Sequence, residues 1–180
     1  MGKKSRKKKK KTKNKKTLVE IASGSSGDEQ DDRILKVLKA RSENEARVNR
    51  VNVEKYFEYL RNNIEMPCIL TGIESAGCFS WEEYYTFGPG KKKKYEKLKR
   101  KYPSYTDEYE LLGFDGFDEE EGILVQVITI CDKVKLNLQF ITISGRKKYA
   151  FPLADLEAVD KNSNNSQMLD DYSVWFVNYR

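Results

Sequence analysis

The sequence predicts an α+β protein: a small SH3-like antiparallel β-barrel flanked by an N-terminal and a C-terminal helix, preceded by a disordered basic tail. Three observations lead to this expectation. Short runs with the apolar alternation of strands occupy the second half of the chain. Apolar residues at helical spacing occur both before and after these runs. A lysine run without apolar residues opens the chain and cannot contribute to a core.

The tail and the rest of the chain carry opposite charge. Residues 1–17 hold eleven of the 34 basic residues and no acidic residue, which leaves 23 basic against 28 acidic residues in 18–180. We expect residues 1–30 to be a disordered lysine-rich tail with a linker, and 31–47 to be a helical lead-in. The tail could contact a polyanion by counterion release. Its candidate nucleic-acid-binding residues are Lys7, Lys8, Lys9 and Lys10.

An α+β domain is expected over residues 48–180. Asn52 is a good N-cap for a helix whose apolar residues recur from Val53 to Ile64, and Pro67 ends this helical region. Apolar runs broken by turn residues then predict strands at 68–73, 109–114, 123–130, 134–143 and 147–151.

Two further segments complete the expected domain. Residues 77–105 are rich in aromatic and basic residues and contain Gly88-Pro89-Gly90, which interrupts regular secondary structure. This segment is predicted to be an insertion. The aromatic part, Phe79–Phe87, could also contact a protein partner. Residues 167–178 place Leu169 and three aromatic residues on one helical face and therefore predict a closing helix.

The composition excludes several kinds of chemistry. The chain has no histidine, which removes nucleophile–histidine pairs, histidine general bases and histidine zinc sites. Three cysteines cannot form a four-cysteine zinc site, so a metal site would use oxygen ligands and favour a hard cation. No paired carboxylates are placed as acid and base, and no apolar run approaches a membrane span. We expect a non-enzymatic cytoplasmic protein.

The densest acidic segment is Asp107–Glu121, with eight acidic residues and no basic residue in fifteen positions. Such crowding costs Coulomb energy unless a cation neutralises it, and calcium takes six to eight oxygen ligands. The alternative is a solvated turn that discourages strand pairing. The candidate calcium ligands are Asp115, Asp118, Glu119, Glu120 and Glu121.

A second oxygen-rich segment, residues 160–171, can be aligned with an EF-hand loop. The aligned ligand positions are Asp160, Asn162, Asn164 and Asp171. The alignment is imperfect, because position 12 is Asp rather than Glu and no entering helix precedes it. The alternative is an Asn/Ser loop that caps the last helix.

The third segment, Lys91–Lys101, holds eight basic residues and one acidic residue. With Tyr95, Tyr102 and Tyr105 nearby, it could bind phosphates and stack bases, and its candidate nucleic-acid-binding residues are Lys91, Lys92, Lys93 and Lys94. Alternatively, its lysines form a solvated helix face that pairs with the neighbouring acidic segment.

Three stretches resemble the small bacterial calcium-binding family typified by cyanobacterial CcbP. They are residues 56–68, residues 148–157 with the pattern Pro-Leu-x-x-Leu-Glu, and the closing Leu169–Trp175. The resemblance covers about residues 50–76 and 108–178. It implies a small barrel closed by a Trp-containing helix, and calcium held by surface carboxylates, here at 115–121 and at 160–171.

The sequence therefore leads to a non-enzymatic protein that buffers or senses calcium through surface carboxylates. The alternative is a nucleic-acid or ribonucleoprotein accessory module, in which a basic arm accompanies an SH3-like barrel. The two hypotheses differ in their ligand. The first predicts saturable calcium binding without the tail, and the second predicts binding to a polyanion that weakens steeply with salt.

Overall fold

The computed structural model describes residues 25–74, 76–130 and 146–180. The helices are α1 (Ser25–Leu38), α2 (Arg50–Asn63), α3 (Glu83–Thr86), α4 (Lys92–Lys99) and α5 (Asn164–Asn178), with the 3-10 helices η1 (Gly77–Glu82) and η2 (Leu153–Asp155). The strands are β1 (Ile69–Gly72), β2 (Glu108–Asp118), β3 (Gly122–Thr129), β4 (Lys148–Pro152) and β5 (Leu156–Ala158). The expected strand 134–143 and tail residues Lys7–Lys10 lie outside the described residues.

The described strands form one antiparallel sheet in the order β4-β3-β2-β1-β5. The α+β class is confirmed, but this sheet is open, because β4 and β5 are its two edges and do not pair with each other within the described ranges. The expected SH3-like barrel is therefore corrected to an open sheet. A closed barrel encloses its core, whereas this sheet buries its inner face against helices.

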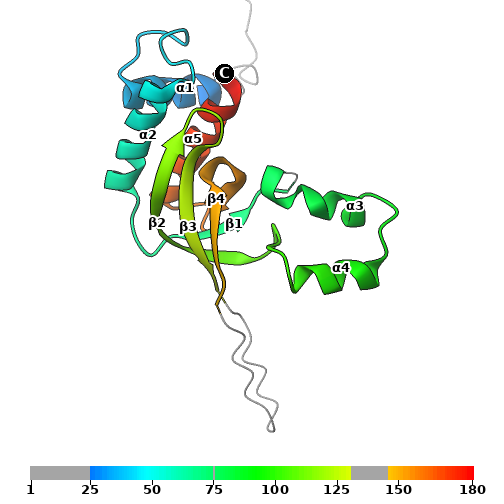
Figure 1. Cartoon of the computed structure of the whole chain (residues 1–180). Helices are drawn as coiled ribbons and strands as arrows, with labels where there is room; N and C mark the ends of the chain where they lie inside the picture. The colour runs from blue at the N-terminus through cyan, green and yellow to red at the C-terminus, as the bar shows by residue number, and fades with distance from the viewer. Residues whose placement is uncertain (1–24, 75, 131–145) are drawn as a thin grey trace, which may run out of the picture.

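Helices α2 and α5 pack against the inner face of the sheet, and α1 packs on these two helices (Figure 1). In β3, Ile123, Val125 and Val127 are buried, while the alternate Gln126 is exposed, as expected for a strand that is covered on one side. Trp175 of α5 completes the core. The predicted closing helix and the predicted strand at 123–130 are both confirmed, with ends that differ by a few residues.

The first helix begins earlier than the sequence predicts. Residues 25–30 were expected to be linker, yet α1 starts at Ser25. Contacts with α5 account for the difference, because Gln30 donates to Asp170 and Asp171, and Arg33 forms an ion pair of 2.7 Å with Asp171. Local composition favours a flexible chain here, and the tertiary contacts favour a helix.

The N-cap of α2 also differs from the prediction. The capping residue is Asn49, whose side chain accepts a hydrogen bond from the Asn52 amide at 3.0 Å. Asn52 itself is buried, and its amide group donates to the carbonyls of Glu45 and Arg47. Both asparagines form hydrogen bonds with backbone groups near the start of the helix. The sequence pattern alone therefore cannot tell which of the two is the N-cap.

The turn between β2 and β3, residues 119–121, is held against α5. Gly122 has a φ of +75°, and a Cβ atom on it would clash with the Tyr172 hydroxyl. That hydroxyl accepts a hydrogen bond of 2.8 Å from the Ile123 amide. Glycine is therefore required for both the turn and the close approach of α5. The acidic turn has a defined place in the fold.

Residues 77–103 form a lobe, containing η1, α3 and α4, that projects from the side of the sheet (Figure 1). We call it the aromatic–basic lobe. It connects β1 to β2, and the Gly72 amide at the end of β1 donates to the Tyr105 carbonyl at 3.0 Å. No helix within the described ranges is long and apolar enough to cross a membrane.

Candidate functional site

The acidic residues predicted as calcium ligands begin at the end of β2. Asp118 shapes the turn itself, since its Oδ1 atom accepts hydrogen bonds from the amides of Glu120 at 2.8 Å and Glu121 at 2.6 Å. This is the local pattern of a short polar side chain that stabilises a turn. One oxygen of Asp118 is therefore already used by the backbone of the turn.

Two of the predicted ligands point to other partners. Asp115 accepts a hydrogen bond of 3.0 Å from the side chain of Gln126 on the neighbouring strand. Glu119 accepts one of 2.7 Å from the amide of Arg50, the first residue of α2, where the helix dipole favours a carboxylate. Asp115 and Glu119 therefore have hydrogen-bond partners on β3 and α2.

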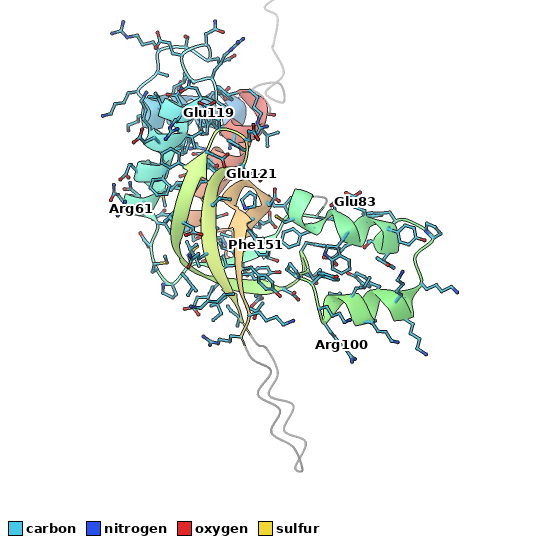
Figure 2. The ribbon with its side chains drawn as sticks, viewed as in Figure 1. Arg61, Glu83, Arg100, Glu119, Glu121 and Phe151 are labelled. Atoms are coloured by element: carbon cyan, nitrogen blue, oxygen red, sulfur yellow. The ribbon has the colours of Figure 1, made fainter. Side chains whose placement is uncertain are left out.

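Glu120 and Glu121 line a cavity of about 580 Å³ together with Asp155. Asp155 ends η2, between β4 and β5, and its Oδ2 atom accepts a hydrogen bond of 2.9 Å from the Cys78 amide. Figure 2 shows Glu119 and Glu121 at the same end of the molecule. The fold thus brings an acidic residue about thirty positions away to the same cavity as the two turn residues.

The pKa of the Cys78 thiol is affected by the negative charge in this cavity. Burial is the largest cause that raises the pKa of Cys78, to about 12, followed by the hydrogen bond with Asp155 and by the charges of Asp155 and Glu121. A neighbouring carboxylate disfavours a thiolate, because two negative charges repel. Asp155 and Glu121 therefore both raise the pKa of this thiol.

Arg180 also lines the cavity. Its Nη2 atom donates a hydrogen bond of 2.7 Å to the Glu120 carbonyl, and its guanidinium lies 4.4 Å from the centre of the Phe176 ring. This arginine supplies positive charge next to the two glutamates. It offsets part of their mutual repulsion when no cation is bound.

The carboxylates line one cavity without already converging on one point. Within the described ranges, no three cysteine or acidic side chains are close enough together to hold a metal ion as they stand. Glutamate side chains are long and rotatable, so Glu120 and Glu121 can turn toward Asp155 at a cost in side-chain entropy. The arrangement suits a cation that accepts variable geometry, such as calcium, more than one that requires a rigid octahedron.

The second predicted loop, residues 160–171, is mostly helical. Asp160 accepts a hydrogen bond of 3.0 Å from the Asn162 amide, and Ser163 caps α5. Asn164 is the first residue of that helix, and Asp171 lies two turns further along, paired with Arg33. The structure therefore places the four aligned residues in a cap and a helix, and it does not bring them together.

The lysines predicted to bind nucleic acid lie elsewhere. Lys91 precedes α4, and Lys92, Lys93 and Lys94 form its first turn, all four exposed. Figure 2 shows Arg100, which follows the same helix, far from Glu119 and Glu121. The acidic turn and the basic helix are thus separate surfaces.

Sequence reasoning missed Asp155. It lies within the Pro-Leu-x-x-Leu-Glu segment, which the sequence indicates as a structural anchor because Leu153 and Leu156 are apolar. Both leucines are indeed fully buried. An acidic residue between two buried leucines was the available signal, because a polar side chain in such a place must face a polar partner, a cavity or solvent.

A comparison with models of protein families returns the same family as the resemblance. The model of the CcbP family, described as calcium binding, matches residues 95–176, which include the acidic turn and Asp155. Two solved structures are similar to the chain: a calcium-binding protein in its calcium-binding form (16% identity, TM-score 0.44) and Anabaena CcbP (18% identity, TM-score 0.42). Each alignment covers 85% of this chain and 93% of the other. No curated protein matches.

Proposed function

We propose that this chain is a non-enzymatic protein that binds calcium in the cavity lined by Glu120, Glu121 and Asp155. One observation carries the proposal: the calcium-binding family model matches the part of the chain that supplies all three carboxylates, and the fold places them in one cavity. Carboxylates are the oxygen ligands that calcium prefers, and each can bind through one or two oxygens. Water and backbone carbonyls would complete the coordination.

The surroundings of the cavity favour calcium buffering over calcium sensing. A sensor has to open or rearrange when calcium binds. Here the acidic turn is tied to α5 through the Tyr172 hydroxyl and to Arg180 through the Glu120 carbonyl. These contacts leave the side chains free to turn and hold the backbone in place, so binding is expected to change the fold little.

In this proposal, the other predicted ligands support the site and do not coordinate the ion. Asp118 supports the turn that presents Glu120 and Glu121, and Asp115 and Glu119 add to the negative potential at this end of the molecule. A second calcium site at residues 160–171 stays a prediction. Asp171 could bind an ion there only by giving up its contacts with Arg33 and Gln30.

A calorimetric calcium titration of the full chain, with excess magnesium in the buffer, tests the proposed function. We expect saturable binding in the micromolar to sub-millimolar range, because the carboxylates must rearrange before they can coordinate the ion. Magnesium should compete weakly, since it is reluctant to lose its water and demands a stricter geometry. Circular dichroism should change little if the protein is a buffer. The absence of any binding heat and of any thermal stabilisation by calcium would refute the proposal.

Calcium is also expected to lower the pKa of Cys78. A bound cation neutralises Asp155 and Glu121, whose charges help to raise that pKa, so the thiolate becomes less unfavourable. The measurement is the rate of alkylation at mildly alkaline pH, resolved by mass spectrometry, which should rise several-fold with calcium. Cys68 is the internal control, because its pKa is raised mainly by burial and it does not line the cavity. An equal change at both cysteines, or none at Cys78, would argue against calcium in this cavity.

A further inference from the structure

The aromatic–basic lobe carries a surface that calcium binding does not use. Between residues 91 and 101 it has eight basic residues and one acidic residue, and all the basic ones except Lys99 are exposed. The ion pairs found in the described parts of the chain involve Arg33, Arg61, Arg146 and Lys161, and none involves residues 91–101. The alternative interpretation, in which these lysines pair with the acidic segment, therefore finds no ion pair among the described residues.

This charge distribution costs energy in the isolated protein. Lys93 and Lys97 are four residues apart on α4, and Lys94 is three residues from Lys97, so these like charges face each other along one side of the helix. No residue of α4 is buried, so core packing does little to offset the repulsion. A bound polyanion would remove it.

An exposed aromatic ring, that of Tyr102, directly follows the basic residues Arg100 and Lys101 in the chain. Tyr102 is 53% exposed, and its ring centre lies 6.0 Å from that of Trp81. Trp81 packs in turn near Tyr95, and its indole N–H donates a hydrogen bond of 3.0 Å to the Pro103 carbonyl, immediately after Tyr102. Tyr102 is thus supported by Trp81, and a planar group could stack on it with little loss of conformational freedom.

The interior of the lobe is held by a buried carboxylate. Glu82 is 1% exposed and accepts hydrogen bonds from the Tyr95 hydroxyl at 2.5 Å, the Ser104 hydroxyl at 3.0 Å and the Tyr105 amide at 2.8 Å. These contacts join η1 to α4 and to the chain that enters β2. The segments that carry the exposed ring and the lysines are therefore joined by hydrogen bonds. Such a supported arrangement is suitable for a binding surface.

We propose that the lobe binds single-stranded nucleic acid, with the phosphates at Lys97, Arg100 and Lys101 and an unpaired base on Tyr102. Basic residues beside an exposed, supported aromatic ring are the combination that recognises a single strand. A lipid surface fits less well, because α4 directs Tyr95 into the lobe and exposes charged residues, so it has no apolar face for a membrane. The basic surface extends toward β4, since Lys147, the residue before that strand, donates to the Arg100 carbonyl at 2.9 Å.

The test uses the full chain, with chelator present so that the result does not depend on calcium. Binding of a fluorescent oligothymidylate of about 12 nucleotides is followed by anisotropy over a salt series. We expect Tyr102→Ala to weaken binding about tenfold and Tyr102→Phe to leave it unchanged, because only the first removes the stacking ring. The triple variant K97Q/R100Q/K101Q should reduce the slope of log affinity against log salt by about two.

A matched triple variant, K36Q/K39Q/R41Q, removes the same charge from exposed positions outside the lobe and keeps the lysine tail. It should retain the wild-type slope. The proposal is overturned if Tyr102→Ala binds like the wild type, or if the two triple variants lose the same affinity, because the binding would then be unspecific attraction to net charge. Tighter binding to phosphatidylserine vesicles that needs the lobe lysines but not Tyr102 would also overturn it, in favour of a membrane surface.

Discussion

The double variant E121Q/D155N is expected to lose calcium affinity by about a hundredfold or more, with little change in the fold. It removes two of the three carboxylates that line the cavity while keeping the shape of both side chains. The side-chain amide introduced by D155N would still offer an oxygen to the backbone amide of Cys78, so the contact between η2 and η1 can persist. Affinity is measured by calorimetry and the fold by circular dichroism.

The charge-matched control for this variant is D115N/E119Q. Both residues lie on the same hairpin, but the cavity does not include them, and their hydrogen bonds with Gln126 and the Arg50 amide can be kept by the new amide oxygens. We expect the control to retain calcium affinity within a few-fold, since it removes nearby charge and no carboxylate that lines the cavity. If the control instead loses as much affinity as E121Q/D155N, the ligands are the exposed turn carboxylates predicted from the sequence. If neither variant loses affinity, the calcium site lies elsewhere.

Trp175→Ala is expected to have the largest effect on stability, lowering the free energy of unfolding by about 3–5 kcal/mol. Trp175 is fully buried, and its ring stacks on that of Tyr56 with 4.7 Å between centres. Its indole N–H donates a hydrogen bond of 2.6 Å to the carbonyl of Ala46, which leads into α2. Truncation would leave a cavity and an unpaired carbonyl at the junction of α5, α2 and the chain that precedes α2. Urea unfolding measures the loss.

Two companion variants show which part of the tryptophan matters. Trp175→Phe keeps an aromatic ring and loses the hydrogen bond, so we expect an intermediate loss of about 1–3 kcal/mol. Val177→Ala, on the same helix but 64% exposed, should change the free energy of unfolding by less than about 0.5 kcal/mol. A loss of only that size for Trp175→Ala would mean that α5 is not anchored through this residue.

Local patterns predicted most of the secondary structure. The alternation of Ile123, Val125 and Val127 predicts a strand covered on one face, and the structure confirms it. The apolar spacing of Leu169 and Trp175 likewise predicts the closing helix. These predictions succeed because side-chain direction repeats every two residues in a strand and every 3.6 residues in a helix. The spacing of apolar residues in the sequence therefore indicates which face is buried. Strand β5, only three residues long, is too short to show such a period and was missed.

The candidate site was predictable only in part. The density of acidic residues at 115–121 indicates a cation site, but the same density cannot tell which carboxylates share a cavity. That is decided by hydrogen bonds to other elements: Glu119 is bound to the start of α2 and Asp115 to β3. The contribution of Asp155 depends on how η2 is placed against η1, and no local pattern contains that information.

The amino-acid sequence was sufficient to predict the α+β class and the charged segments and to exclude histidine ligands, because these follow from composition and from short-range periodicity. Only the tertiary structure decided that the sheet is open, that Asp171 is paired with Arg33, and that Glu120, Glu121 and Asp155 line one cavity. The physical reason is the same in each case. Strand pairing, ion pairs between helices and shared cavities join residues far apart in the chain, and their energies depend on distances that appear only when the elements pack.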